Sequence, residues 1–214
     1  MKSSHIPRAT IQRLSVYVQV LEDLLKQGDK VISSESLATA CGVNPSQIRK
    51  DLAYFGEFGV RGVGYYVVDL LTAIKQSLGI DKTWNVALVG VGNLGRALLR
   101  HQVLQDRGFH IKAAFDCDPF KIGEEIAGLE VFCTRRLKEK VGELGLEIGF
   151  ITTPPERAQR AANYLMEAGI KGIVNFAPAR ITVPEHIAVE YVDFIHNLLS
   201  VAFTVSLNQS KGLV

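Results

Sequence analysis

The sequence has 214 residues, of which 47% are hydrophobic, and its formal net charge is +2. This composition excludes a disordered chain and leaves room for two small domains or one large one. No apolar run is long enough to span a membrane, and the first residues lack the apolar stretch of a secretory signal, so we expect a cytoplasmic protein. Cys41, Cys117 and Cys133 are scattered without a Cys-x-x-Cys pair, so we expect neither a metal site nor a disulfide framework.

The positive charge is not spread evenly along the chain. Residues 1–80 hold nine Lys and Arg against seven Asp and Glu, whereas residues 81–214 hold fifteen of each. A small excess of positive charge is compatible with DNA binding by the first part of the chain, although it does not demonstrate it.

The first part of the chain begins with two predicted helices. Apolar residues recur at helical spacing across residues 11–27, and Gly28 is a natural end for that helix. Ser33 or Ser34 can cap a second helix. The residues expected to face inward are Leu14, Tyr17, Val18, Leu21, Leu24 and Leu25 on the first helix and Leu37, Ala38 and Ala40 on the second.

A third helix and a hairpin complete this part. Asn44 can cap a helix that starts at Pro45 and runs to Phe55, with Ile48, Leu52 and Phe55 buried. Residues 56–67 combine four glycines with aromatic residues and valines, which predicts a small hairpin, or wing. Another apolar helical pattern spans Val68 to Leu78. We therefore predict a winged-helix domain over residues 1–80.

The third helix has the side chains expected of a helix that enters the major groove of DNA. Arg and Lys make the commonest specific contacts with guanine, and Arg61 at the wing tip can contact phosphate or the minor groove. An ordinary solvated helix with two basic residues is the alternative. The candidate DNA-binding residues are Ser46, Gln47, Arg49, Lys50, Tyr54 and Arg61.

After a linker at residues 79–83 the pattern changes to short apolar strands that alternate with helices. This alternation predicts an α/β fold with a mainly parallel, doubly wound, Rossmann-like sheet covered on both faces. The predicted strands are 86–89, 111–115, 148–152, 173–175 and 188–192, and the clearest helical patterns cover 94–105 and 156–168.

The strand at residues 86–89 leads into a Gly-x-Gly-x-x-Gly motif, and an acid, Asp116, follows one strand later. Gly90 permits the tight turn, Gly92 lets a pyrophosphate approach the backbone, and Gly95 lets the helix pack close to the strand. The helix start points free N–H groups at the phosphates. The motif residues predicted to contact the dinucleotide are Gly90, Val91, Gly92, Asn93, Leu94 and Gly95.

Asp116 can accept hydrogen bonds from both ribose hydroxyls and would repel a 2′-phosphate, which favours NAD⁺ and NADH over NADP⁺. Lys121 nearby weakens that preference. Later strands are followed by Thr152-Thr153-Pro154 and by Asn175, where a loop over the nicotinamide half would lie. These residues are candidate cofactor contacts, with turn and capping roles as the alternative.

No set of residues suggests catalysis. His101, His110, His186 and His196 do not occur with a paired carboxylate and a substrate-binding arginine. We therefore expect a protein that is not an enzyme, with three alternatives left open: a small NAD-dependent oxidoreductase with a helical appendage, a CoA-binding domain, and a purely structural interaction module.

The last segment, from Asp193 to Leu207, is helical in pattern and apolar nearly all round. A helix of this kind must be buried. Because it ends a small domain, we expect a second subunit to cover it.

Three segments together resemble the bacterial Rex redox-sensing repressors over nearly the whole chain. They are Gln47 to Gly56 with Arg61-Gly62-Val63-Gly64-Tyr65, then Gly90 to Leu98, then Ala114 to Gly123. The resemblance implies a homodimer that binds a pseudo-palindromic, A·T-rich operator in double-stranded DNA when NADH is scarce and releases it when NADH binds.

The resemblance also implies roles for residues near the end of the chain. The terminal helix, in residues 193–214, would be exchanged between subunits, and residues 81–192 would form the NAD(H)-binding domain. Phe194 would lie against the reduced ring, and Asp193 would change its partner between states. Many relatives have an arginine where Gln19 stands and a tyrosine where His101 stands. A switch through Gln19, His101 and Asp193 would therefore use different bonds here or be weaker.

Overall fold

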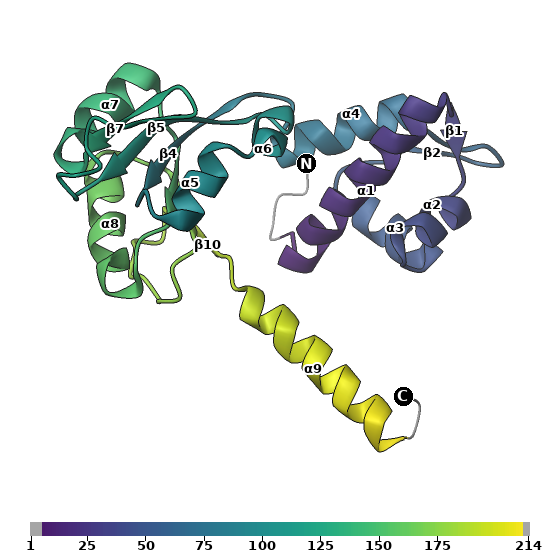
Figure 1. The fold of residues 1–214 in the computed structure, drawn as a ribbon. Helices are drawn as coiled ribbons and strands as arrows, with labels where there is room; N and C mark the ends of the chain where they lie inside the picture. Colours follow the sequence, from purple (N-terminus) through teal and green to yellow (C-terminus); the bar gives the residue numbers. More distant parts are fainter. Residues whose placement is uncertain (1–5, 212–214) are drawn as a thin grey trace. The chain divides into compact units, whose positions relative to one another are not determined.

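The computed structural model describes residues 6–211, and the chain divides into two compact units, Met1–Lys82 and Thr83–Val214. Figure 1 shows the helices and strands of each unit in chain order. Within residues 6–211 no helix combines the length and the hydropathy that a membrane crossing requires. Over the same residues no group of three His, Cys, Asp or Glu side chains is arranged to hold a metal ion.

The first unit opens with three helices whose ends follow from local sequence. Helix α1 (Arg8–Gln27) ends where Gly28, with φ 88°, donates its N–H to the last carbonyls. Helix α2 (Ser34–Cys41) begins where the Ser33 side chain accepts from the Ser36 N–H at 3.0 Å. Helix α3 (Pro45–Leu52) begins where Asn44 accepts from Gln47 at 2.8 Å. Of the two candidate caps of α2, Ser33 is the one observed, and the predicted cap at Asn44 is confirmed.

A small antiparallel sheet forms the wing of the first unit. Its strands are β1 (Val31–Ile32), β2 (Gly59–Val60) and β3 (Gly64–Tyr66), in the order β1-β3-β2, and helix α4 (Val67–Leu78) follows. One apolar core joins these elements to α1–α3, and its largest fully buried side chains are Leu14, Tyr17, Leu21, Leu37, Ile48, Leu70 and Ile74. The predicted winged helix is therefore present.

Three details of the first unit differ from the prediction. Helix α3 ends at Leu52, so Tyr54 and Phe55 lie in the turn that follows it rather than on the helix. Ala40 and Leu25 were expected to face inward, but both are exposed. Each lies in the last turn of its helix, on the side away from the core that Leu24 and Cys41 contact.

The second unit is built on a seven-stranded sheet in the order β10-β9-β8-β4-β5-β7-β6. Every neighbouring pair is parallel except β6 with β7. The strands are β4 (Trp84–Val89), β5 (Phe109–Asp116), β6 (Glu125–Ile126), β7 (Leu129–Cys133), β8 (Ile148–Ile151), β9 (Gly172–Asn175) and β10 (Ala188–Tyr191). This doubly wound order confirms the predicted α/β class.

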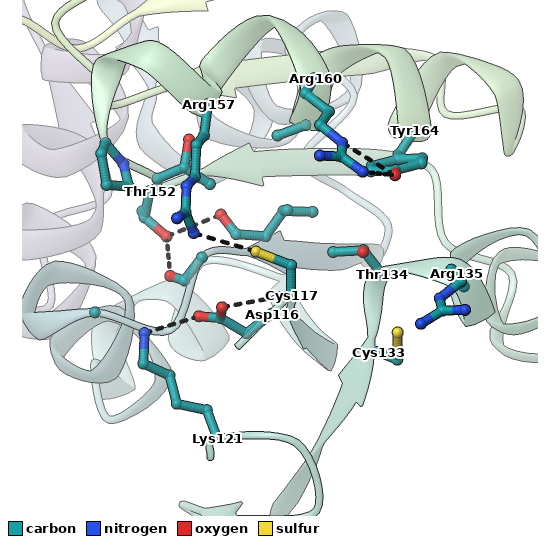
Figure 2. Close-up of a pocket in the computed structure, with 16 residues that line it drawn as sticks. Asp116, Cys117, Lys121, Cys133, Thr134, Arg135, Thr152, Arg157, Arg160 and Tyr164 are labelled. Carbon is teal, nitrogen blue, oxygen red and sulfur yellow. Dashed lines mark hydrogen bonds and ion pairs between the residues drawn. The ribbon is translucent and has the colours of Figure 1, made fainter. Parts of the chain in front are cut away.

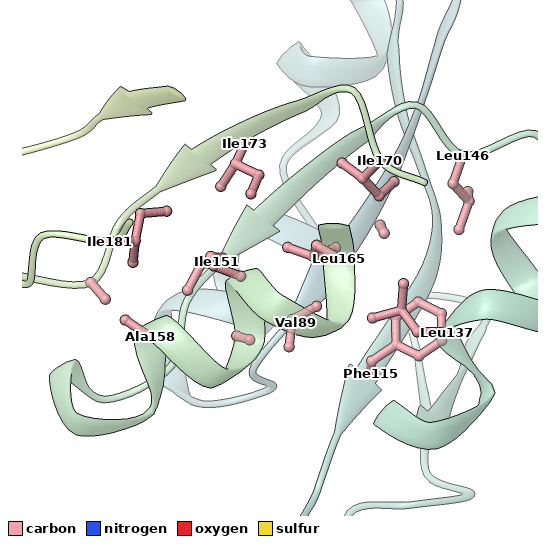
Figure 3. Packing of buried hydrophobic residues seen from close by; sticks show 14 of the residues in the cluster. Val89, Phe115, Leu137, Leu146, Ile151, Ala158, Leu165, Ile170, Ile173 and Ile181 are labelled. Atoms are coloured by element: carbon pink, nitrogen blue, oxygen red, sulfur yellow. The ribbon is translucent and has the colours of Figure 1, made fainter. Parts of the chain in front are cut away.

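Helices cover both faces of the sheet. The helices α5 (Asn93–Leu99), α6 (Gln102–Asp106), α7 (Leu137–Leu144) and α8 (Pro155–Glu167) connect the strands, with a short 3₁₀ turn, η1 (Thr134–Arg136), before α7. Figure 3 shows the larger core, in which Leu165 of α8 and Leu137 of α7 pack with Phe115 of β5 and Ile151 of β8. A second core on Val86, Leu88 and Leu99 fills the other face.

The single helix predicted over residues 94–105 is wrong, because the chain forms α5 and α6 with a break between them. Arg100 and His101 donate their N–H groups to carbonyls three residues back, which tightens and ends α5. His101 is then extended, with φ −85° and ψ 93°, and begins α6. The sequence patterns also gave no sign of β6, β7 and α7.

The chain ends in helix α9 (Phe194–Ser210), which Asp193 caps by accepting from the Ile195 N–H at 2.9 Å. Its mean composition is apolar, yet none of its residues is buried within this chain. The most exposed of its large apolar side chains are Phe194, Phe203 and Leu199, at 68%, 66% and 65%.

Candidate functional site

A cavity of about 720 Å³ lies at the carboxyl ends of the central strands. From β4 the chain winds to β5 and β7 on one side and to β8, β9 and β10 on the other, so the order reverses between β4 and β8. Ligands of open α/β sheets bind at such a reversal, and a cavity of this size suits a nucleotide. The cavity is lined by Val89, Gly90, Gly92, Asp116, Cys117, Lys121, Cys133, Thr134, Arg135, Thr152, Thr153, Pro154, Arg157, Arg160, Ala161 and Tyr164, and Figure 2 shows these residues as sticks.

The three glycines of the loop have different surroundings. Gly90 has φ +104°, and a Cβ there would lie 2.8 Å from the Thr152 backbone. A Cβ on Gly95 would collide with the carbonyl oxygen of Gly90, so this position holds α5 against the loop. A Cβ on Gly92 would meet nothing within 4 Å, because Gly92 faces the open cavity. This difference matches the predicted division between packing glycines and a glycine that leaves room for a ligand.

Asp116 ends β5 and is only 6% exposed. Its carboxylate accepts from the N–H groups of Val91 (2.8 Å), Cys117 (2.8 Å) and Asp118 (3.0 Å). Lys121 Nζ adds a fourth bond at 3.1 Å, which Figure 2 shows as a dashed line. Burial alone would raise the pKa of Asp116, but these bonds, led by those from the backbone of Asp118 and Val91, hold its pKa below the usual range.

The loop after β8 closes the cavity from the other side. The Thr152 hydroxyl donates to the Gly90 carbonyl at 2.6 Å and ties this loop to the glycine loop. The Thr153 hydroxyl is buried and has no partner among the described residues. Buried hydroxyls are nearly always hydrogen-bonded, so an unpartnered one in a cavity wall is a sign of a missing ligand contact. The orphaned hydroxyl and the open space over Gly92 fit a dinucleotide.

The sequence analysis missed several residues that line the cavity. Arg157 and Arg160 come from α8 and Arg135 comes from η1. Arg157 donates to Cys117 Sγ at 3.3 Å, and Arg160 donates to the Tyr164 hydroxyl at 3.0 Å (Figure 2). These arginines belong to different elements and no motif, so no local pattern pointed to them.

Several predicted cofactor contacts lie outside the cavity lining. Val91 contributes its backbone to Asp116 and buries its side chain, whereas Asn93 and Leu94 are exposed at the start of α5. Asn175 is fully buried, and its side chain bonds the Ala177 N–H and the Ala179 carbonyl within its own loop. In the structure the Asn175 side chain therefore stabilises its own loop.

The predicted switch residues are all exposed. Gln19 lies on α1 in the first unit, and His101 begins α6 in the second. Asp193 caps α9, so its carboxylate already accepts one backbone N–H. Phe194 follows it and is 68% exposed.

The candidate DNA-binding residues of α3, the turn after it and the wing differ in the partners of their side chains. Lys50 and Ser46 are exposed on α3, and Arg61 is exposed in the turn between β2 and β3. Arg49 is exposed too, but it donates to the Ser34 and Ser46 hydroxyls, at 3.0 Å and 3.4 Å, and lies 3.8 Å from the Glu35 carboxylate. Tyr54, 39% exposed, lies beyond the helix. The remaining candidate, Gln47, donates to Asp51 at 2.9 Å.

Asp51 is a buried carboxylate that the sequence analysis did not identify. It is 1% exposed and accepts from Thr10, Arg13 and Tyr17 of α1 as well as from Gln47. The Arg13 bonds measure 2.6 Å and 2.7 Å. Burial would raise the pKa of Asp51, and the side-chain bonds, led by Arg13, outweigh it and hold that pKa low. This cluster fixes α3 against α1.

Comparisons with known proteins find matches in both units of the chain. Residues 81–179 match the family described as CoA binding domain, and residues 5–53 match the family described as putative DNA-binding protein N-terminus. The chain is 71% identical over 206 residues to the redox-sensing transcriptional repressor Rex of Maridesulfovibrio salexigens, covering 96% of this chain and 99% of that protein. It is 48% identical over 201 residues to Rex 1 of Thermotoga maritima, covering 94% and 96%.

Solved structures give the same result. The crystal structure of RSP in complex with β-NAD⁺ and operator DNA matches with a TM-score of 0.90 and 36% identity, over 99% of this chain and 96% of that one. The structure of RSP with β-NADH matches with a TM-score of 0.87 and 34% identity, over 99% and 98%. A third match, with a TM-score of 0.88 over 98% and 97%, is RSP described as a Rex-family repressor.

Proposed function

Because this chain belongs to the Rex family of redox-sensing transcriptional repressors, we propose that it is a homodimer that represses transcription according to the balance of NADH and NAD⁺. It binds a pseudo-palindromic operator in double-stranded DNA when NADH is scarce and releases it when NADH binds. The observation that carries this proposal is that one chain joins a winged helix to a nucleotide cavity. The same chain matches the structure of RSP with β-NAD⁺ and operator DNA and the separate structure of RSP with β-NADH. A protein that acts on operator DNA would work in the cytoplasm, and we include that location in the proposal.

The cavity residues would hold the dinucleotide through their backbone. The free N–H groups at the start of α5 face a pyrophosphate that approaches over Gly92. Thr153 would supply its unpartnered hydroxyl, and Thr152 and Pro154 would shape the loop near the nicotinamide half. A nicotinamide cofactor carries the redox state as the charge of its ring, which is positive when oxidised and neutral when reduced.

The difference between the two cofactor forms would act at Phe194. An apolar side chain that encloses the ring disfavours the cationic form and accepts the neutral one. Phe194 is exposed at the start of α9, so a swapped α9 would bring it to the partner's cavity. NADH would then shift the dimer toward the arrangement that encloses its ring. The size of this shift is set by the difference in NADH affinity between the two arrangements.

DNA release would follow from a change in the spacing of the two winged helices. The half-sites of an operator lie about one helical turn apart or a multiple of it, so a modest rotation of the subunits removes the match. Lys50 and Arg61 would contact the DNA directly, because both are exposed and neither has a hydrogen bond or ion pair of its side chain among the described residues. Gln47 and Arg49 would contribute partly by holding α3 in place, through their bonds to Asp51 and to Ser34. The switch through Gln19, His101 and Asp193 remains part of this proposal.

Two alternatives predict different ligand behaviour. An NAD-dependent oxidoreductase would turn over NADH, yet the described lining of the cavity includes no histidine and its only carboxylate is Asp116, which is fully hydrogen-bonded. A CoA-binding protein is favoured by the family match over residues 81–179. Competition of CoA against NADH separates this alternative from ours.

The test is an operator gel shift with the full-length protein and NADH, NAD⁺ or NADPH added in turn. We expect the free protein to retard the operator, NADH to release it and an equal concentration of NAD⁺ to leave it bound. Asp116→Ala should bind operator as well as the unchanged protein does but should fail to respond to NADH, because loss of the carboxylate frees the Val91 loop and Lys121. Equal release by NADH and NAD⁺ would contradict redox sensing.

A further inference from the structure

A groove of about 470 Å³ in the first unit lies between the start of α2, helix α3 and the wing. It is lined by residues 33–35, by Arg49 and by residues 59–65. Its described lining holds two cations, Arg49 and Arg61, and one carboxylate, Glu35. Arg49 lies on α3 and Arg61 lies in the turn of the wing, and both are candidate DNA contacts. The groove is therefore part of the candidate DNA-binding surface, and Glu35 puts a negative charge into it.

The Glu35 carboxylate lies beside one of the two cations. Arg49 Nη1 is 3.8 Å from Glu35 Oε1. The Ser34 hydroxyl connects the two side chains, because it accepts from Arg49 at 3.0 Å and donates to Glu35 at 3.2 Å. The positive charge of Arg49 is thus partly balanced by a carboxylate of the same chain, and a DNA phosphate that binds Arg49 would have to approach that carboxylate.

The contact between Arg49 and Glu35 is too weak to be mainly a structural bond. The two side chains are 54% and 70% exposed, and 3.8 Å is longer than a hydrogen bond. Exposed ion pairs of this kind contribute little to stability. A phosphate bound to Arg49 would lie within the electrostatic screening length from Glu35, which is about 8 Å at physiological ionic strength, so the two negative charges would repel each other. The repulsion of phosphate is therefore the larger effect of Glu35.

We propose that Glu35 limits the affinity of the winged helix for DNA by competing with a backbone phosphate for Arg49. The inference rests on the proposed DNA binding and identifies a residue that sets its strength. Phosphate binds a guanidinium through charge-assisted hydrogen bonds and would displace the carboxylate, which then takes up a cation from solution. Because every DNA sequence presents the same phosphates, Glu35 weakens the sequence-independent part of the affinity and leaves the choice of site to base contacts.

The experiment measures binding of the full-length protein, without NADH, to a labelled operator duplex and to a scrambled duplex of equal length. Fluorescence anisotropy is recorded at several salt concentrations. Glu35→Gln removes the charge and keeps the length of the side chain. We expect it to bind both duplexes about 3-fold more tightly at low salt. The slope of log affinity against log salt should become steeper by about one, because binding no longer leaves a carboxylate that takes up a cation.

Two further variants test whether the effect passes through Arg49. Asp23→Asn is the matched control, because Asp23 is an exposed acid of the same unit, pairs with Lys26 and lies outside the groove lining. It makes the same change in net charge and should leave both affinities nearly unchanged. Arg49→Gln should weaken both duplexes alike. In that background Glu35→Gln should give a smaller gain than in the unchanged protein, because no guanidinium is released to the phosphate.

DNA binding by Glu35→Gln that is unchanged or weaker would overturn the inference, as would an equal gain in Asp23→Asn. An equal gain with and without the Arg49 side chain would overturn the competition for Arg49. All three results leave the proposed function intact, provided that the unchanged protein binds operator and releases it with NADH. Failure of the unchanged protein to bind operator rejects the proposed function itself.

Discussion

Among single residues, Asp51 is the buried one that contacts the candidate DNA-binding surface, through Gln47. Its carboxylate lies in the core of the first unit, where α3 crosses α1, and receives side-chain donors from both helices. An isolated buried charge would be very costly, but one with this many donors is stable. Because Gln47 is one of the donors, the same cluster that fixes α3 also fixes a residue predicted to face DNA.

We predict that Asp51→Asn lowers the free energy of unfolding by about 3 kcal/mol, because Arg13 and Tyr17 would lose a buried charged acceptor. Urea unfolding at pH 7 measures this loss. Asp23→Asn is the control, since Asp23 is exposed and bonds only Lys26, and its effect should stay within about 0.5 kcal/mol. Equal stability of Asp51→Asn and the unchanged protein would show that the cluster contributes nothing.

The pH dependence of the same cluster follows from the direction in which the pKa of Asp51 is shifted. The pKa of Asp51 is lower in the folded protein than in the unfolded chain, so its stabilisation is fully present above the unfolded value of about 3.9 and is lost as pH falls toward the folded value. The unchanged protein should therefore lose stability below about pH 4 more steeply than Asp51→Asn does.

Residues in contiguous motifs could be predicted from the sequence, whereas residues assembled from distant segments could not. Gly90, Gly92 and Gly95 have distinct surroundings that match their predicted roles. Arg157 and Arg135 reach one cavity from different elements, and nothing in their local sequence marks them. Asn175 lies at the end of β9, where a cofactor contact was expected, but its side chain bonds the backbone of its own loop.

At the scale of elements, the sequence predicted helices with strong periodicity and clear caps, and it missed short or irregular ones. Helix α8 is strongly amphipathic and matches its prediction within one residue at each end. The break at Arg100 and His101 has no Gly or Pro, so only the observed hydrogen bonds reveal it. Strand β6 has two residues, too few for any alternation to register.

Helix α9 has an apolar sequence, yet none of its described residues is buried in the single chain. Its apolar side chains are exposed in the single chain, and a large exposed apolar patch is typical of an interface. Burying a leucine or phenylalanine is worth about 1.5–3 kcal/mol, so several of them per subunit would support a stable dimer.

We predict that Leu199→Glu with Phe203→Glu converts the dimer to monomers, because each protomer would bring two charges into the apolar interface. Sedimentation at micromolar concentration measures the change. Gln209→Glu on the same helix is the control and should leave the dimer intact, because Gln209 is already polar and exposed. A double variant that remains dimeric would place the interface elsewhere.

At the scale of the whole molecule, the cofactor cavity and the candidate DNA surface belong to different compact units. No single contact therefore needs to carry the signal, because both ligands can act by favouring different states of the dimer. Such coupling is reciprocal in free energy: if NADH weakens operator binding by some factor, operator must weaken NADH binding by the same factor.

We predict that saturating operator duplex lowers the affinity for NADH by the factor by which NADH lowers operator affinity, on the order of 5- to 150-fold for typical coupling energies. Fluorescence titration of the reduced nicotinamide, with and without operator, measures this factor, and a scrambled duplex of equal length controls for charge. NAD⁺ should show a smaller factor, because an apolar cap at Phe194 would distinguish the two ring charges. The same NADH affinity with and without operator would mean that the two sites are not energetically coupled. The sensor proposal would then fail even if both ligands bind.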